Sequence, residues 1–460
     1  MWKISNGKIG VSMNILDKIY EAGIVGAGGA GFPTHIKFNC NVDYFIINAA
    51  ECEPLLNTDK YLITIKCKEM IKAIEEVGKV VGAKHLVIAI KEKYAKEIQL
   101  LRESIKELNS SVEIFYLKNY YPAGDEQMIV YEVTGKSIPE AGIPLDVGAV
   151  VANVGTLINV YDSFEDKPVI EKYITVIGEV KNPTMLKVPI GTSIAECIEA
   201  AGGSNLKEYC IIIGGPMMGN IIDDDESYNK YIKKVDGSLI VLPKDHYIVE
   251  RKRKPLEIII NETRSACIQC RYCTDLCHRY LLGHKLRPHR VMRNIGMSEQ
   301  DEDIMKEALI CCECGICELY SCPMGLSPRL VNIYIKGLLT KKSIRAEKGS
   351  LDIQNREMLE YRKIPTERIM GRIDILKYKD QQIDDVKEVN PRKVAVYLHQ
   401  HIGKPATSMV SVGDYVTKGE KIGTVERSDM GANVHASIDG KVIEVSDKII
   451  IQREDSGVIS

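Results

Sequence analysis

The sequence predicts a multidomain protein of mixed α/β and α+β class, with an α/β unit near its N-terminal end and a small all-β unit near its C-terminal end. Three observations lead to this prediction. At 460 residues the chain is too long for one hydrophobic core. Apolar strands alternate with helical segments between residues 42 and 117, whereas short strands separated by Gly and Asp follow residue 394. Finally, two closely spaced cysteine runs lie between residues 267 and 322.

Composition narrows the class of protein. Lys and Arg total 61 against 63 Asp and Glu, a formal net charge of −2, so no nucleic-acid partner is expected. The apolar fraction of 45% is that of a globular protein. No run approaches the roughly 18 apolar residues of a spanning helix, and residues 1–7 lack the apolar core of a signal peptide. Fourteen Cys, eight of them in the two closely spaced runs, point to a reducing cytoplasm as the expected location.

A glycine-rich run, residues 23–34, follows a predicted amphipathic helix over residues 12–22. Five Gly in nine residues allow backbone N–H groups to approach a phosphate or a flat ring closely. The run lacks the G-x-x-x-x-G-K-[ST] pattern, and no apolar strand leads into it, so it fits neither a P-loop nor a dinucleotide-binding fingerprint. A flexible turn remains an alternative.

Strand–helix alternation after this run predicts a mostly parallel sheet. The predicted strands are 42–48, 85–90 and 111–117, with helices over 59–80 and 93–107. Glu51 and Glu53 follow the first strand, at the sheet edge where open α/β sheets bind ligands. Plain surface carboxylates are the alternative. A further helix opens at residues 124–126, and residues 151–156 close the unit.

A second unit has the order strand, turn, strand, helix. The strands cover 173–180 and 185–188, and the helix covers 193–201 before Gly202 and Gly203 end it. The glycine-rich loop 214–219 follows. It has the composition of a ligand-binding loop, but a structural spacer is an equal alternative.

The two cysteine runs predict iron–sulfur clusters. They are Cys267, Cys270, Cys273 and Cys277, then Cys311, Cys314, Cys317 and Cys322. In two-cluster ferredoxins the fourth Cys of each run ligates the other cluster. On that pattern one [4Fe–4S] cluster has the ligands Cys267, Cys270, Cys273 and Cys322. The other has Cys277, Cys311, Cys314 and Cys317.

Zinc and disulfides are the alternatives to clusters. Zinc usually recruits two C-x2-C pairs, so a third cysteine at the same spacing is surplus. Disulfides need an oxidising compartment. Cys312 lies out of register and is interpreted as a bystander, while His278 stands where Pro often follows the fourth cysteine. The other cysteines (Cys40, Cys52, Cys67, Cys197 and Cys210) show no ligand spacing and are interpreted as free thiols.

After the second cysteine run the chain continues as a predicted helix over 328–339. Residues 341–392 are highly charged with weak helical periodicity, which predicts a connecting arm. A solvated arm is favoured, and an arm that wraps the surface or meets a partner is the alternative. Short strands over 394–454, punctuated by Gly and Asp, predict a small all-β barrel.

The glycine run with Lys37 resembles the flavin loop of the NADH-oxidising subunit of respiratory complex I. Residues 48–59 and 153–156 are similar to that family's acidic segment and its later flavin contact. The resemblance implies that residues 1–165 bind FMN, with NADH stacked over it. The implied contacts are Gly26, Gly28, Gly29, Ala30, Gly31, Phe32, Lys37, Asn48, Glu51, Glu53 and Asn153. The chain departs from the family at Ala27, where Arg is frequent, and at Ala152, where Asn is frequent.

The remaining units resemble modules of related redox proteins. Residues 170–250 resemble the β-grasp (SLBB-like) module, 255–340 a two-cluster ferredoxin, and 393–454 the barrel-sandwich hybrid related to lipoyl domains, joined by 341–392 as a charged linker. The hairpin 428–431 has no Lys for a lipoyl or biotinyl group. The barrel is therefore expected to have a docking or structural role and not to carry a covalent cofactor.

This order of units resembles the cobalamin reductase of propanediol-utilisation microcompartments. In the related peripheral subunit of the Rnf ferredoxin:NAD oxidoreductase, the barrel precedes the flavin unit. The resemblance implies an NADH-dependent oxidoreductase that passes electrons through FMN and two [4Fe–4S] clusters to cobalamin. A flavin is the natural converter between hydride and single-electron transfer.

Two alternatives stay open for this function. One is a peripheral subunit of a membrane-associated complex, and the other is a non-enzymatic iron–sulfur relay. Expected partners are a redox protein or a cobalamin-dependent system, with a microcompartment shell or membrane-complex subunits as further candidates. The expected location is the cytoplasm, or the interior of a bacterial microcompartment.

Overall fold

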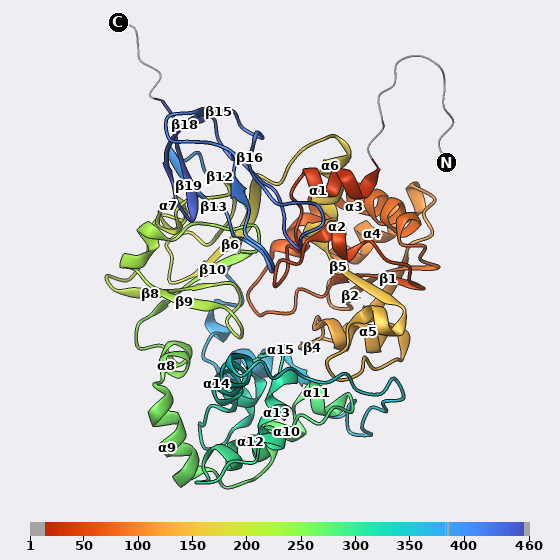
Figure 1. The fold of residues 1–460 in the computed structure, drawn as a ribbon, viewed down its shortest axis with the longest axis vertical. Coiled ribbons are helices and arrows are strands. Elements are labelled where there is room, and N and C mark those ends of the chain that lie inside the picture. The colour runs from red at the N-terminus through yellow and green to blue at the C-terminus, as the bar shows by residue number, and fades with distance from the viewer. Residues whose placement is uncertain (1–13, 382, 384–385, 455–460) are drawn as a thin grey trace, which may run out of the picture.

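The fold was determined as a computed structural model, and it describes residues 14–381, 383 and 386–454. Four folded units are arranged around the middle of the molecule (Figure 1). We call them the N-terminal unit (14–164), the middle unit (171–243), the cysteine unit (247–341) and the C-terminal unit (393–454). Figure 1 shows the cysteine unit below the other three.

The N-terminal unit is a four-stranded sheet in the order β3-β2-β1-β5. Its strands are parallel, as the strand–helix alternation predicted. Its strands are β1 (Tyr44–Ala49), β2 (His85–Lys91), β3 (Glu113–Leu117) and β5 (Ala149–Asn153). Its helices are α1 (Ile15–Glu21), α2 (Thr34–Lys37), α3 (Thr58–Val80), α4 (Ala95–Glu107), α5 (Glu126–Thr134) and α6 (Val154–Phe164). Positions 12 and 13 of the predicted first helix lie outside the described residues. Helices cover both faces, so Phe45, Ile46 and Ile47 of β1 are fully buried.

The middle unit contributes five strands to a six-stranded sheet in the order β12-β7-β6-β10-β8-β9. The edge strand β12 (Val386–Glu388) comes from the segment that follows the cysteine unit. The elements of the middle unit are β6 (Glu171–Gly178), β7 (Thr184–Pro189), α7 (Ile194–Ala200), β8 (Tyr209–Ile213), β9 (Asn220–Asp223) and β10 (Ser238–Pro243). A capping box starts α7, because the Ser193 hydroxyl accepts from the Glu196 N–H while the Glu196 carboxylate accepts from the Ser193 N–H. The predicted strand–turn–strand–helix order is confirmed.

The cysteine unit is built from short helices that bring its cysteine-bearing loops together. Its helices are α8 (Tyr247–Arg253), α9 (Leu256–Ala266), α10 (Tyr272–Asp275), α11 (His278–Leu281), α12 (Pro288–Ile295), α13 (Glu302–Lys306) and α14 (Pro328–Lys341). A small apolar core that includes Val291, Val331 and Ile335, all fully buried, holds α12 against α14.

The connecting segment (342–392) differs from the predicted solvated arm. It contains β11 (Ile364–Pro365), α15 (Thr366–Arg372) and β12 (Val386–Glu388). Ile369 and Ile373 are fully buried in an apolar cluster that also contains residues of the middle and cysteine units. In addition, β11 pairs with β4 (Tyr120–Tyr121), and β12 extends the middle sheet. The prediction was wrong here because isolated apolar residues within a charged stretch give no periodic signal, yet some of them, such as Ile369 and Ile373, are buried between units.

The C-terminal unit consists of two small antiparallel sheets, β13-β19-β18-β15 and β14-β16-β17, which confirms the predicted all-β class. Its strands are β13 (Lys393–Tyr397), β14 (Thr407–Ser408), β15 (Tyr415–Val416), β16 (Lys421–Thr424), β17 (Val434–His435), β18 (Gly440–Val445) and β19 (Lys448–Gln452). Its apolar interior is continuous with that of the N-terminal unit.

Lys234 of the middle unit ties these two units together. Its ammonium donates to the backbone carbonyls of Gly23 (2.7 Å) and Asn433 (2.8 Å). Burial lowers the pKa of Lys234 to about 7. Gly23 has φ +65°, and a Cβ at this position would lie 2.2 Å from the Asn433 carbonyl oxygen, so only glycine fits.

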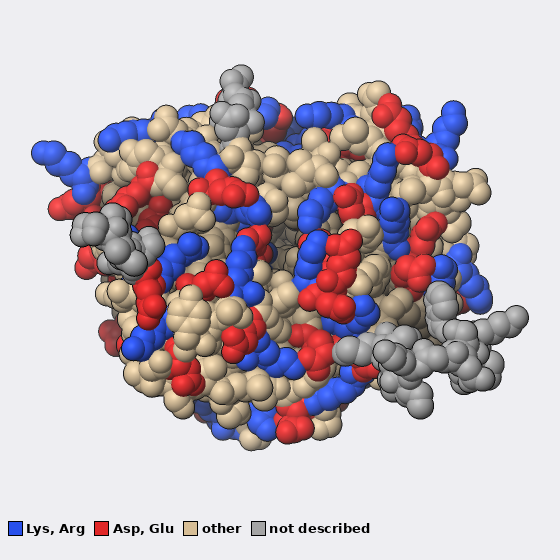
Figure 2. Space-filling model, turned by 90° about the horizontal axis from the view of Figure 1, so that it is seen from above, with Lys and Arg blue, Asp and Glu red and all other residues tan. Residues whose placement is uncertain are grey.

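Acidic and basic side chains are interspersed over the face of the molecule seen in Figure 2. That face shows no broad area of one charge sign, in keeping with the near-zero net charge. None of the helices in the described ranges is long and apolar enough to cross a bilayer.

Candidate functional site

A cavity of about 1110 Å³ lies between the N-terminal and middle units. It is bordered by the glycine run, by the carboxyl ends of β1 and β5, by the first turns of α3 and α6, and by β6. Loops of the middle unit border it as well, together with Cys312 and Cys314 of the cysteine unit. The position at the carboxyl ends of parallel strands is the one expected for a ligand site in an open α/β sheet.

Only the central part of the glycine run reaches the cavity. Ala27, Gly28, Gly29 and Ala30 border it. A Cβ on Gly28 would lie 2.7 Å from the Asn153 amide nitrogen, whereas one on Gly29 would meet nothing within 4 Å. The run therefore passes close over the start of α6 and then opens toward the cavity, which is the arrangement that lets a ligand approach the backbone.

The remaining predicted residues of this run lie away from the cavity. Gly26, Gly31 and Phe32 do not border it, and neither does Lys37. The Lys37 ammonium instead pairs with the Glu126 carboxylate at 2.8 Å. The structure therefore brings together three of the predicted residues in this run and leaves the other four outside the cavity.

Asn48, Glu51 and Asn153 all border the cavity. The Asn48 amide donates to the Gly124 carbonyl at 2.8 Å, which fixes the end of β1. The buried Glu51 carboxylate accepts from the Asp59 N–H at 2.9 Å, and burial raises its pKa. Asn153, the N-cap of α6, accepts from the Gly155 N–H at 2.9 Å.

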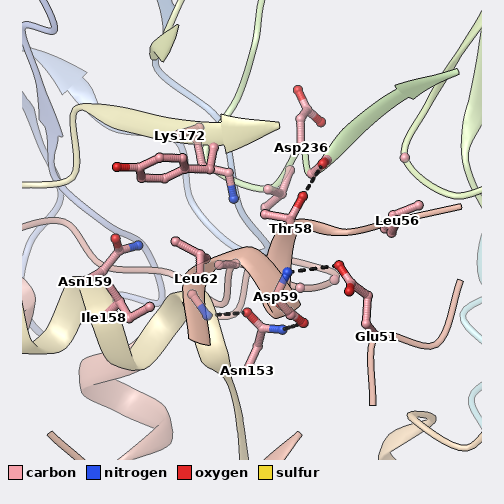
Figure 3. Close-up of a pocket in the computed structure, with 18 of the residues that line it drawn as sticks. Glu51, Leu56, Thr58, Asp59, Leu62, Asn153, Ile158, Asn159, Lys172 and Asp236 are labelled. Atoms are coloured by element: carbon pink, nitrogen blue, oxygen red, sulfur yellow. Dashed lines mark hydrogen bonds between the residues drawn. The ribbon is translucent and has the colours of Figure 1, made fainter. Parts of the chain in front are cut away.

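Asp59 joins this group, although the sequence singled it out only as the end of a similar segment. Its carboxylate accepts from the Asn153 amide at 2.8 Å (Figure 3). Burial, followed by the neighbouring Glu51 charge, raises the pKa of Asp59 to about 7. The wall formed by Glu51, Asp59 and Asn153 can accept hydrogen bonds from sugar hydroxyls.

Glu53 has a different environment from Glu51. Its carboxylate accepts from the backbone N–H groups of Met217 (2.8 Å) and Met218 (3.1 Å), and it lies 3.3 Å from the Tyr121 hydroxyl oxygen. Burial raises its pKa. Glu53 thus borders the cavity while holding loop 214–219 of the middle unit in place.

Lys172 of β6 also faces the cavity and was missed from the sequence (Figure 3). In the sequence Lys172 follows Glu171 at the charged start of β6, and such a residue is usually interpreted as solvent-exposed. It is instead only 8% exposed.

The cysteines form two groups of four, each around its own small cavity. Cys267, Cys270, Cys273 and Cys322 border one, and Cys277, Cys311, Cys314 and Cys317 border the other. These are the two crossed sets that the ferredoxin pattern indicates. The structure therefore carries Cys322 across to the first run and Cys277 across to the second.

The chemistry of the cysteine groups fits iron–sulfur clusters. Burial and the neighbouring thiols raise the pKa of Cys273 to about 12, so four crowded thiolates need a cationic metal group to neutralise them. Backbone N–H groups point at the sulfurs of Cys311 (from Glu313, 3.4 Å) and Cys322 (from Leu326, 3.3 Å), as expected around thiolate ligands.

Cys312 and His278 lie beside the second cysteine group. The Cys312 sulfur is 3.2 Å from His278 Nε2, and a sulfur–nitrogen distance of 3.8 Å joins Cys314 to His278 Nδ1. Cys312 and Cys314 border both the second cysteine cavity and the large cavity. The Tyr121 hydroxyl donates to the Cys314 carbonyl at 2.8 Å and strengthens this contact. The second cysteine group is therefore the one that shares a wall with the large cavity.

Comparison with known families assigns a module to each unit. The matching models are described as the Nuo51 FMN-binding domain (residues 19–162), the SLBB domain (173–220), the 4Fe-4S dicluster domain (266–327) and the RnfC barrel sandwich hybrid domain (373–459).

Similar curated proteins cover nearly the whole chain. "Cobalamin reductase PduS" of Citrobacter freundii is 37% identical over 442 residues, 95% of this chain and 96% of that protein. Its namesake in Salmonella typhimurium is 37% identical over 95% of both chains. One component of the proton-translocating ferredoxin:NAD(+) oxidoreductase complex of Clostridium ljungdahlii is 32% identical, over 58% of this chain and 56% of that protein. With an FMN-binding domain, an iron–sulfur dicluster domain and this identity over almost its full length, the chain belongs to the cobalamin reductase PduS family.

Proposed function

We propose that this chain takes electrons from NADH and passes them, by way of FMN and two [4Fe–4S] clusters, to cobalamin. FMN supplies the conversion of a two-electron hydride donor into single electrons, and the clusters accept single electrons. Cobalamin is proposed as the acceptor from the similarity to the two PduS reductases.

The observation that carries the proposal is the wall shared by two sites. Cys314, a proposed cluster ligand, borders the cavity that the glycine run and the acidic wall also border. A nucleotide in that cavity would lie next to the second cysteine group without a separate domain between them. This adjacency favours electron transfer within one chain over two independent binding modules.

In this proposal each wall of the cavity has its own part. Gly28, Gly29 and Ala30 would offer backbone N–H groups to the flavin nucleotide, and Asn153 would fix the α6 turn beneath it. Asn48 would hold the β1 end. Glu51 would accept hydrogen bonds from ligand hydroxyl groups. Glu53 would close the cavity by holding the loop of the middle unit.

The first test is anaerobic purification with iron, sulfide and flavin analysis, followed by titration with NADH. The two cysteine groups predict about eight Fe and about one FMN per chain. NADH is expected to bleach both flavin and cluster absorbance. Reconstituted protein that carries both cofactors yet shows no NADH-dependent bleaching would contradict the proposal.

A second candidate is a peripheral subunit of a membrane-associated redox complex. It is favoured by the similarity to components of ion-translocating oxidoreductase complexes over more than half of the chain. Co-purification with membranes would support this candidate. Co-purification with a microcompartment shell or a cobalamin-dependent enzyme would instead support the reductase, which we place in the cytoplasm or inside such a compartment.

A further inference from the structure

Lys172 is a buried cation that nothing in the described part of the protein directly neutralises. It belongs to β6 of the middle unit, is 8% exposed and borders the large cavity. Its ammonium makes no direct ion pair or hydrogen bond with any residue that the structure describes. Figure 3 shows this side chain extending from β6 toward the space between Thr58 and Leu62.

Other lysines that border the cavity are paired. Lys66 forms an ion pair with Asp162 at 2.9 Å, and Lys187 forms one with Glu171 at 3.2 Å. The Lys172 side chain is buried, but its unpaired ammonium is open to the cavity, where it can meet a ligand. Burial lowers the pKa of Lys172, and the charges of Asp236 and Asp59 act in the opposite direction without reaching it as ion-pair partners.

The groups around Lys172 suit the phosphate and the sugar hydroxyl groups of a nucleotide. The α6 helix, 11 residues long, begins at the cavity, so its first N–H groups carry partial positive charge there. The open position at Gly29 gives a ligand access to this end. Glu51 and Asp59 supply acceptors for sugar hydroxyls. An ammonium in the same cavity adds a cationic hydrogen-bond donor, a kind of group that commonly pairs with phosphate.

We propose that Lys172 binds a phosphate group of the nucleotide held in this cavity, so that the middle unit contributes directly to nucleotide binding. This inference rests on the proposed function, because it presupposes that the cavity holds FMN or NADH. Both ligands carry the required chemistry: FMN has a terminal monophosphate, and NADH has a diphosphate. The experiment must therefore separate these two sources.

The test compares wild-type protein with Lys172→Gln. Lys244→Gln is the matched control, since Lys244 lies next to the same unit, pairs with Asp224 and does not border the cavity. The affinities for FMN and for riboflavin, which lacks the phosphate, are measured by flavin fluorescence on flavin-free protein. The affinity of the flavin-loaded protein for NAD⁺ is measured by calorimetry.

Loss of one charge-assisted hydrogen bond is expected to weaken binding about tenfold or more. If Lys172→Gln weakens FMN but not riboflavin, the partner is the FMN phosphate. If it weakens NAD⁺ while FMN is unchanged, the partner is the dinucleotide. Wild-type affinity of Lys172→Gln for both ligands would overturn the inference.

A second measurement needs no variant and guards against misfolding of Lys172→Gln. Acetylation of wild-type lysines is followed by mass spectrometry with and without FMN or NAD⁺. Protection of Lys172, with no change at Lys244, is expected with at least one of the two ligands. Equal labelling with both would refute the inference, whereas wild-type protein that binds neither nucleotide would refute the proposed function together with it.

Discussion

Cys322→Ser is the substitution that tests the crossed cysteine groups most directly. Cys322 belongs to the second run in the sequence, yet it borders the cavity of Cys267, Cys270 and Cys273. Each group of four thiolates is sufficient for one [4Fe–4S] cluster. The structure therefore predicts that Cys322→Ser damages the cluster of the first run and leaves the other one intact.

The expected size of the effect follows from the two groups of four. Wild-type protein should hold about eight Fe per chain, and complete loss of one cluster should leave about four. Serine is a poor replacement for a thiolate, so partial retention of a damaged cluster would give an intermediate value. Iron analysis measures the loss, and EPR of the reduced protein identifies the cluster that is lost.

Two reference variants assign the EPR signals. Cys270→Ser removes a ligand that belongs to the first group on any pairing, and Cys314→Ser does the same for the second. The Cys322→Ser spectrum should match that of Cys270→Ser. A match to Cys314→Ser would refute the crossed arrangement. Cys40→Ser, a thiol outside both groups, should retain both signals.

Three further variants test the walls of the large cavity and the contact between units. Glu53→Gln should lower the free energy of unfolding by about 1–3 kcal/mol, because the amide N–H₂ would face a backbone N–H group that now donates to the carboxylate. Urea denaturation measures this loss, and an unchanged midpoint would contradict it. Asp59→Asn should change the pH dependence of stability. The folded pKa of Asp59 is raised from 3.8 to about 7, so its stabilising effect is present below pH 3.8 and is lost as the pH rises through about 7. Thermal melts should therefore show a gain for Asp59→Asn at pH 8 that disappears near pH 4, and a constant difference would rule out this explanation. Gly23→Ala should destabilise the protein by more than about 1 kcal/mol, since φ is +65° and the Asn433 carbonyl leaves no room for a Cβ, whereas Gly29→Ala should leave the melting temperature unchanged. Equal melting temperatures for the two glycine variants would refute the steric argument.

The parallel sheet could be predicted because its signal is local, and the proposal of cluster ligands rests on a local signal as well. Three cysteines spaced two apart place their sulfurs on one loop, and the pattern known from ferredoxins supplies the fourth. Alternation of apolar strands and helices likewise indicates a parallel sheet, because each helix connects two parallel strands and packs its apolar face on the sheet. These signals need only a few neighbouring residues, and the structure agrees with the parallel sheet.

The resemblance did not specify how individual residues lie relative to the cavity. It implied a role for the whole glycine run and Lys37, but the backbone turns Gly31 and Phe32 away, and Glu126 pairs with Lys37. Side-chain direction in a loop depends on its turns and on partners that are distant in the chain. A linear motif cannot specify either of these.

By itself, the sequence determined the class of each unit, the two cysteine runs and the expectation of a nucleotide site at the carboxyl ends of the strands. Only the tertiary structure decided which residues meet across units. Lys172 enters a cavity formed largely by another unit, and Glu53 holds the middle-unit loop. Cys314 comes to lie at the wall of that cavity, next to Cys312. The physical reason is that these contacts depend on how separately folded units dock, and docking is set by buried surface and backbone donors spread over the whole chain rather than by any local pattern.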